Sequence, residues 1–165
     1  MNRALARTAS RTPVHGFTLV EMLIALVIIG ILAAVALPSF NDSVRKSRRA
    51  DAFTVFAALQ QAQERWRGNN ASYSDTLANT AAAGSPPNGL GVAATSSAGY
   101  YSIALSGVSG SAYTATATAV SGKSQAADGN CVRLRVRMAG GNIFYGSASA
   151  TGEFDESSGN RCWSR

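Results

Sequence analysis

The stretch Gly16-Phe17-Thr18-Leu19-Val20-Glu21 opens an apolar run that extends to Leu37. Some twenty such residues, at a rise of 1.5 Å each, span the roughly 30 Å hydrocarbon core of a bilayer. One carboxylate, Glu21, stands inside the run, where a charge costs roughly 2.5 to 3.5 kcal/mol on insertion scales. The run therefore predicts a membrane helix at 17–37. It also indicates that Glu21 has a function that outweighs the free-energy cost of inserting its charge.

Two simpler accounts of this run remain open. A secretory signal peptide would be cut after the small residues Ala34-Val35-Ala36, although such a peptide usually has a shorter apolar core and no carboxylate. Glu21 could also lie near the lipid headgroups and be hydrated there. If Glu21 is buried, it needs a cation, and because its own apolar helix holds none, the partner has to come from another molecule.

This region resembles the N-terminus of type IV prepilins with a class III leader. A short basic leader ends in Gly16 and is followed by Phe17-Thr18-Leu19-Val20-Glu21-Met22-Leu23-Ile24, then by Gly30-Ile31-Leu32-Ala33-Ala34 and Pro38. The resemblance implies that a prepilin peptidase cleaves after Gly16, that the new amino group of Phe17 is methylated, and that the helix stays in the mature protein. It also implies that Glu21 pairs with the terminal amine of a neighbouring subunit during assembly.

The charge distribution bears on topology. The leader, 1–16, carries three arginines and no acidic residue, and basic residues before a first apolar segment favour a cytoplasmic N-terminus. Charge counting alone is close to a tie, because four basic residues also follow the apolar segment, namely Arg45, Lys46, Arg48 and Arg49. From the leading position of the basic segment and from the resemblance, we expect a single-pass inner-membrane protein that later enters an extracellular pilus.

The helix is expected to continue past Pro38, with a kink, because no Gly or second Pro occurs before Gly68. Its second half, 38–68, is amphipathic, and one sector about 120° wide is apolar. Phe53 falls outside this sector, so we expect one core face and one face available for other contacts. The sector is formed by Ala52, Val55, Phe56, Leu59, Ala62 and Trp66.

Residues 69–99 are rich in small and polar residues and predict a long αβ-loop on the surface, although a partly disordered linker has the same composition. From Tyr100 the period changes to alternation, which predicts four short strands with turns between them in the region 100–165. A half-covered sheet of this kind is typically antiparallel. The fold class is therefore α+β, and the resemblance implies the type IV pilin fold, a long helix whose second half packs on a four-stranded antiparallel sheet.

Cys131 and Cys162 are the only cysteines, and a lone pair in an exported domain generally forms a disulfide. A metal site has no support, since the only histidine, His15, lies in the leader. The C-terminal region also resembles the PilE-like subgroup of pilins, in which an Asp shortly precedes the first Cys and a Cys-Trp pair stands near the end. Here these residues are Asp128, Cys131 and Cys162-Trp163.

No catalytic constellation occurs, because the predicted mature chain has no histidine to activate a nucleophile, and no phosphate-binding glycine motif precedes a helix. We therefore expect neither an enzyme nor a cofactor. The first functional interpretation is a structural subunit, and specifically a minor pilin, of an extracellular type IV pilus that serves adhesion and twitching motility. Its partners would be other pilin subunits, in a homo- or hetero-oligomeric filament, together with the prepilin peptidase and the inner membrane.

The second interpretation is a DNA-binding pilin of a competence system. Arg133, Arg135 and Arg137 alternate along one predicted strand and would form a basic row, with Lys123 nearby in sequence. A solvated sheet face or a subunit contact would account for the same row. A pseudopilin of a type II secretion system shares the N-terminal pattern, but the ending Cys162-Trp163 resembles pilins instead.

Our first prediction is that the mature chain begins at a methylated Phe17, because the resemblance puts the cleavage before the apolar run. Intact-mass measurement of the membrane-bound protein should show the loss of residues 1–16 and the gain of one methyl group. A mature chain that begins at Leu37 would lack Glu21 and would contradict both the cleavage site and the retained helix.

Overall fold

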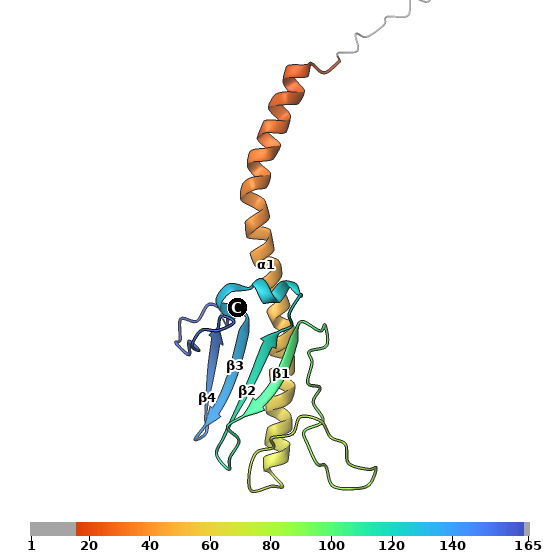
Figure 1. Cartoon of the computed structure of the whole chain (residues 1–165), viewed down its shortest axis with the longest axis vertical. Helices are drawn as coiled ribbons and strands as arrows, with labels where there is room; N and C mark the ends of the chain where they lie inside the picture. Colours follow the sequence, from red (N-terminus) through yellow and green to blue (C-terminus); the bar gives the residue numbers. More distant parts are fainter. Residues whose placement is uncertain (1–15, 164–165) are drawn as a thin grey trace, which may run out of the picture. The chain divides into compact units, whose positions relative to one another are not determined.

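The computed structural model describes residues 16–163, so the predicted leader lies outside the described residues apart from Gly16. One helix, α1 (Leu19–Arg67), is followed by four strands, β1 (Tyr101–Ser106), β2 (Ala112–Ala119), β3 (Arg133–Ala139) and β4 (Asn142–Ala148) (Figure 1). Two short 3-10 helices, η1 (Ser124–Ala127) and η2 (Gly129–Cys131), connect β2 to β3. The predicted α+β class, with one long helix and a four-stranded antiparallel sheet, is confirmed.

Helix α1 begins where its first turn is capped. The backbone N–H of Glu21 donates a hydrogen bond of 3.1 Å to Oγ1 of Thr18. This is the bond from the backbone to the N-cap side chain that occurs in a capping box. Glu21 itself lies in the first turn, where the helix dipole favours a negative charge. The helix continues through Pro38 and ends at Arg67, in agreement with the expectation that the proline does not terminate it.

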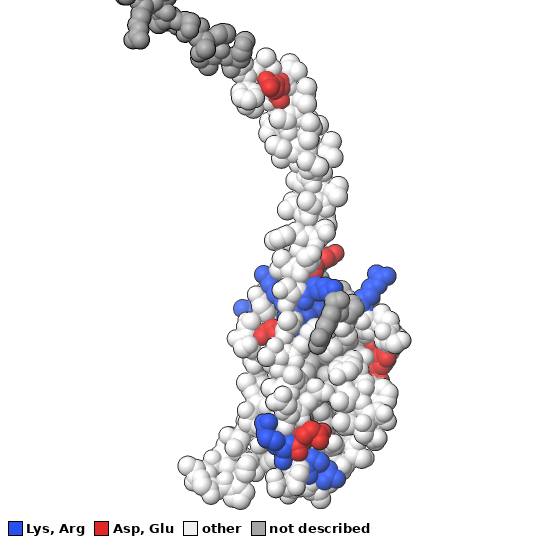
Figure 2. Space-filling model, turned by 180° about the vertical axis from the view of Figure 1, so that it is seen from behind, with Lys and Arg blue, Asp and Glu red and all other residues white. Residues whose placement is uncertain are grey.

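Two compact units divide the chain after Ser39. In the first unit, the large apolar side chains of α1 are exposed from Leu19 to Leu37, and Figure 2 shows this surface as white apart from one acidic patch near its N-terminal end. Among the described residues, α1 is the one helix that is long and apolar enough to cross a membrane. The membrane segment predicted at 17–37 belongs to this unit.

The second unit is built on the sheet, in the order β1-β2-β3-β4 with every neighbouring pair antiparallel. Leu134 and Val136 on β3 are fully buried and share one core with Phe56 and Leu59 of α1. The apolar sector predicted on the helix therefore covers one face of the sheet, as expected. The residues that alternate with Leu134 and Val136 point to the opposite face, which we call the outer face.

Phe53, which lies outside the predicted sector, packs against the C-terminal region. Its ring stacks on Trp163, with 4.7 Å between the ring centroids, and Trp163 also contacts Tyr145 of β4 at 4.8 Å. Helical spacing could not reveal this contact, because Trp163 lies far along the sequence. The sector also missed Gln63, which is fully buried and exchanges hydrogen bonds of 2.9 and 2.8 Å with the backbone N–H and carbonyl of Ser74.

The αβ-loop, 69–99, contains no helix or strand, and it is tied to the rest of the unit. Thr95 forms a bridge with Ser102 of β1, and the backbone N–H of Leu90 donates to the carbonyl of Thr76 at 3.0 Å. Gly89 lies so close to the backbone of Ala78, on the facing part of the loop, that an added Cβ would be 2.0 Å from the carbonyl oxygen of Ala78. These contacts favour the ordered surface loop over the disordered linker.

The C-terminal region is joined to η2, just before β3, by the disulfide between Cys131 and Cys162, and the prediction of this bridge is confirmed. Just before Cys131, the carboxylate of Asp128 accepts two hydrogen bonds from Arg49 of α1, at 2.7 and 2.8 Å. The two side chains are 13% and 5% exposed. The aspartate noted in the sequence pattern therefore fixes the 3-10 segment to the helix.

We predict that Asp128→Asn destabilises the second unit by about 3–5 kcal/mol, because it leaves the buried guanidinium of Arg49 without its counter-charge. Urea denaturation of the full chain in detergent micelles, followed by near-UV circular dichroism, would measure the change. The matched control is Asp42→Asn, which breaks the pair between Arg45 and a carboxylate that is 79% exposed and should cost at most about 1 kcal/mol. Equal losses in the two variants would contradict the role of the buried pair.

Candidate functional site

The three arginines of β3 lie together on the outer face of the sheet. Arg133, Arg135 and Arg137 alternate with buried residues along the strand, so they share one face, as the alternation predicted. We call them the arginine row. Strand register puts a threonine of β2 opposite each of them, and these three are Thr118, Thr116 and Thr114. The outer face thus carries a row of guanidinium groups beside a row of hydroxyl groups.

The row is in contact with residues 149–156, which follow β4 and which we call the strap. Phe154 of the strap lies beneath two guanidinium groups, with its ring centroid 3.9 Å from Cζ of Arg135 and 4.9 Å from Cζ of Arg133. Arg133 also donates hydrogen bonds to the backbone carbonyls of Ser149, at 2.9 Å, and of Gly152. The strap therefore satisfies arginine donors and contributes cation–π contacts.

Glu156, at the end of the strap, binds the other two arginines. Its Oε1 accepts from Nη2 of Arg135 at 2.6 Å and from Nε of Arg137 at 3.1 Å, and its Oε2 accepts from Nη2 of Arg137. The hydrogen bond from Arg137 is the main reason why the pKa of Glu156 lies below its usual value. One carboxylate thus binds two of the three guanidinium groups, and the third, of Arg133, has backbone carbonyls as its acceptors.

Glycine in β4 makes room for this arrangement. Gly146 lies opposite Arg135 in the register, and a Cβ added to it would be 3.0 Å from Cγ of Glu156. Even an alanine there would require Glu156 to shift by a few tenths of an ångström. Sequence reasoning missed Glu156 because the residue stands in a Gly/Ser-rich segment that reads only as a loop, and no local spacing connects it to the arginines.

A second group of basic residues lies at the end of the unit where α1 enters it. Nη1 of Arg48 donates to Oγ of Ser124, and the guanidinium of Arg48 lies 5.1 Å from the ring centroid of Tyr100. The segment that contains Lys123 therefore adjoins this part of the helix. We call Arg45, Lys46, Arg48 and Lys123 the basic end. Figure 2 shows basic side chains gathered where the globular part of the chain begins.

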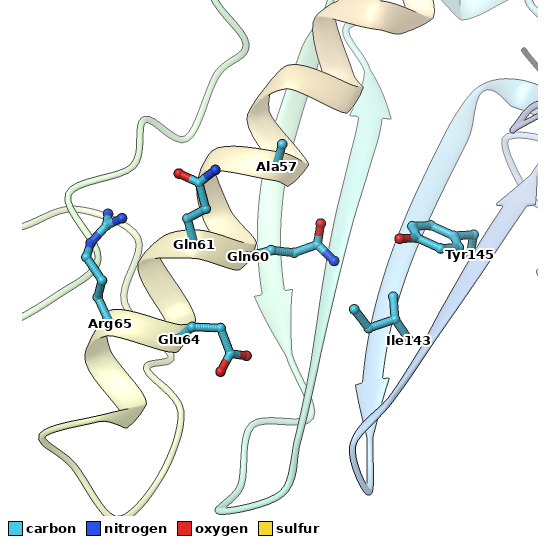
Figure 3. A pocket seen from close by; sticks show the side chains of 7 residues that line it. All are labelled: Ala57, Gln60, Gln61, Glu64, Arg65, Ile143 and Tyr145. Carbon is cyan, nitrogen blue, oxygen red and sulfur yellow. The ribbon is translucent and has the colours of Figure 1, made fainter.

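A shallow groove of about 630 Å³ runs between α1 and β4. In Figure 3, the side chain of Gln60 points across it toward Ile143 and Tyr145 of β4. The side chains of Ile143 and Tyr145 are 42% and 43% exposed. At the outer edge of β4, the one β-bridge among the described residues joins Ser147 to Asp155. The groove is lined by Ala57, Gln60, Gln61, Glu64, Arg65, Ile143 and Tyr145.

The remaining predicted site residues belong to the first unit. Gly16 and Phe17 precede α1 and are exposed, which is compatible with access by a processing enzyme, and Glu21 follows in the capped first turn. The structure thus separates the predicted processing and assembly residues from the arginine row and the disulfide, which belong to the second unit.

Two family models match the chain. The model described as "Type IV minor pilin ComP, DNA uptake sequence receptor" matches residues 38–135, and the model described as "Prokaryotic N-terminal methylation motif" matches residues 11–37. The first match ends inside β3. Arg137, β4 and the strap therefore lie beyond it.

Curated relatives match mainly over short regions. The chain is 41% identical over 60 residues to a fimbrial protein of Moraxella nonliquefaciens, which covers 36% of this chain and 39% of the relative. It is 43% identical over 61 residues to the type IV major pilin protein PilA of Myxococcus xanthus, which covers 37% of this chain and 28% of the relative. It is 52% identical over 40 residues to the fimbrial protein EcpC of Eikenella corrodens, which covers 24% of this chain and 26% of the relative. The chain thus spans well under half the length of each of these relatives.

Proposed function

Since this chain belongs to the family of type IV minor pilins described as ComP, DNA uptake sequence receptor, we propose that it is a minor subunit of an extracellular type IV pilus and that its second unit binds DNA. The methylation motif at 11–37 and the apolar start of α1 fit a pilin that is anchored in the membrane before it enters the filament. The family match also favours this interpretation over a secretion pseudopilin with the same N-terminus.

The exposed apolar surface of α1 supports the assembly part of the proposal. Phe17, Leu19 and Val35 are 75–77% exposed, and the large apolar side chains between them are also exposed. A contiguous apolar surface of this extent marks contact with a membrane or with other proteins. The inner membrane would cover it before assembly, and the helices of neighbouring pilin subunits would cover it in the filament.

Glu21 supports the same proposal by its chemistry. In the filament core its carboxylate would lose water, and an isolated buried charge is strongly unfavourable unless it is paired. Cleavage after Gly16 by the prepilin peptidase would create an ammonium group on Phe17, and methylation would keep its positive charge. We propose that Glu21 of one subunit pairs with the amine of Phe17 in a neighbouring subunit.

The arginine row supports the DNA part. Half or more of protein–DNA hydrogen bonds go to phosphate and sugar, and arginine and threonine side chains are among the donors that make them. The outer face carries three guanidinium groups beside three threonines, with the carboxylate of Glu156 bound to two of the guanidinium groups. The basic end is the competing surface, since it too could attract the phosphate backbone.

We predict that Glu21→Ala leaves membrane insertion intact, because the change removes a charge from the apolar helix, while the amount of subunit in purified filaments falls sharply. Immunoblots of the membrane fraction and of sheared filaments would measure both quantities. Wild-type levels of the variant in filaments would refute the pairing, whereas equal losses from membrane and filament would attribute the effect to instability.

We predict that replacing all three arginines of the row by glutamine lowers the affinity for duplex DNA by about tenfold and reduces the salt dependence of binding, because fewer counterions are then released. Gel-shift titrations of the full chain in detergent micelles, at two salt concentrations, would test this. The matched control carries Arg45→Gln, Lys46→Gln and Lys123→Gln, which remove the same charge from the basic end. A larger loss in the control would transfer DNA binding from the row to the basic end.

A further inference from the structure

Glu156 binds the arginine row in the way that an anionic ligand would. Its two oxygens receive three hydrogen bonds from Arg135 and Arg137, and the side chain is only 20% exposed. Guanidinium groups bind carboxylates and phosphates through the same parallel pairs of N–H donors. The donors that a DNA phosphate would need are therefore already occupied by a group of the chain itself.

The position of the strap favours this contact. Asp155 exchanges two backbone hydrogen bonds with Ser147 of β4, at 3.0 and 2.8 Å, so the residue next to Glu156 is fixed at the sheet edge. Gly146 leaves space for the Glu156 side chain above β4. Because the neighbouring backbone is held by these bonds, rotation of the Glu156 side chain alone would free the two arginines without detaching the strap.

From this geometry we propose that Glu156 is an internal competitor of the DNA phosphates, which fills the anion site formed by Arg135 and Arg137 and limits the affinity of the arginine row. The proposal rests on the proposed DNA-binding function and specifies how that site is regulated. The ligand is the phosphate backbone of duplex DNA. Binding to this backbone does not require recognition of the bases.

The competition depends on salt. Glu156 is attached to the same chain as the arginines, so its local concentration does not change, whereas DNA gains from the release of condensed counterions and does so most strongly at low salt. The carboxylate should therefore prevail at high ionic strength and the phosphates at low ionic strength. Removal of the carboxylate should shift this balance toward DNA.

The test compares Glu156→Gln with Glu153→Gln in the full chain in detergent micelles, by gel-shift titration with duplex DNA at several salt concentrations. Glu153 is an exposed residue of the same strap, so its change removes the same charge without touching the arginines. We expect Glu156→Gln to raise the affinity for DNA about threefold to tenfold above Glu153→Gln. The slope of log affinity against log salt should also become steeper by about one to two, because Arg135 and Arg137 gain phosphate contacts.

Both substitutions are repeated in a chain that carries Arg135→Gln and Arg137→Gln, where Glu156→Gln should give no gain over Glu153→Gln. If wild type binds DNA and the two strap variants bind equally in the original chain, competition by Glu156 is overturned while the DNA-binding function stands. If neither wild type nor Glu156→Gln binds DNA at low salt, both proposals fail. Binding by Glu156→Gln alone would support the internal competitor.

A structural role is separated from competition by the near-UV circular dichroism spectrum, which reports the packing of the aromatic side chains. If Glu156→Gln does not keep the wild-type spectrum, Glu156→Asp takes its place. This change keeps the charge but shortens the side chain by one methylene group, so its oxygens reach the arginines less well. Because the competition is weakened, we expect Glu156→Asp to bind DNA more tightly than wild type. An affinity equal to that of wild type overturns the proposal.

Discussion

The need to cover the apolar surface of α1 is the constraint on which the rest of this protein depends. Residues such as Phe56 and Leu59 meet it within the chain, by packing on the sheet. The residues up to Leu37 do not, because their large apolar side chains are exposed. Burial of apolar area stabilises proteins by roughly 25 cal/mol per Å², so one half of the helix stabilises the fold and the other half drives association with a membrane or with other subunits.

The second unit depends on contacts between residues that are far apart in sequence. The disulfide joins Cys131 to Cys162, and the chain beyond it brings Trp163 onto Phe53 of the helix. The buried pair of Arg49 and Asp128 connects the same region to α1. The short, Gly/Ser-rich C-terminal region has few large apolar residues of its own, so these contacts supply the attachment that hydrophobic burial does not.

The outer face of the sheet shows how a row of like charges is accommodated in a folded protein. Three arginines on one strand face repel one another, and exposed rows of this kind would destabilise the sheet. The strap offsets this repulsion with a carboxylate, two backbone carbonyls and an aromatic ring. The strap thus stabilises the outer face through the same arginine side chains on which the proposed binding of DNA depends.

The sequence by itself determined the elements of this fold. Alternation and helical spacing are local properties, so the long helix, its passage through Pro38, the four strands and the shared face of Arg133, Arg135 and Arg137 were predictable, and two cysteines left one possible pairing. Only the tertiary structure decided which side chains meet across long separations. Gln63 in the core, Phe53 on Trp163 and Glu156 on the arginine row depend on where loops return to the sheet, and no periodic pattern within a single element records that path.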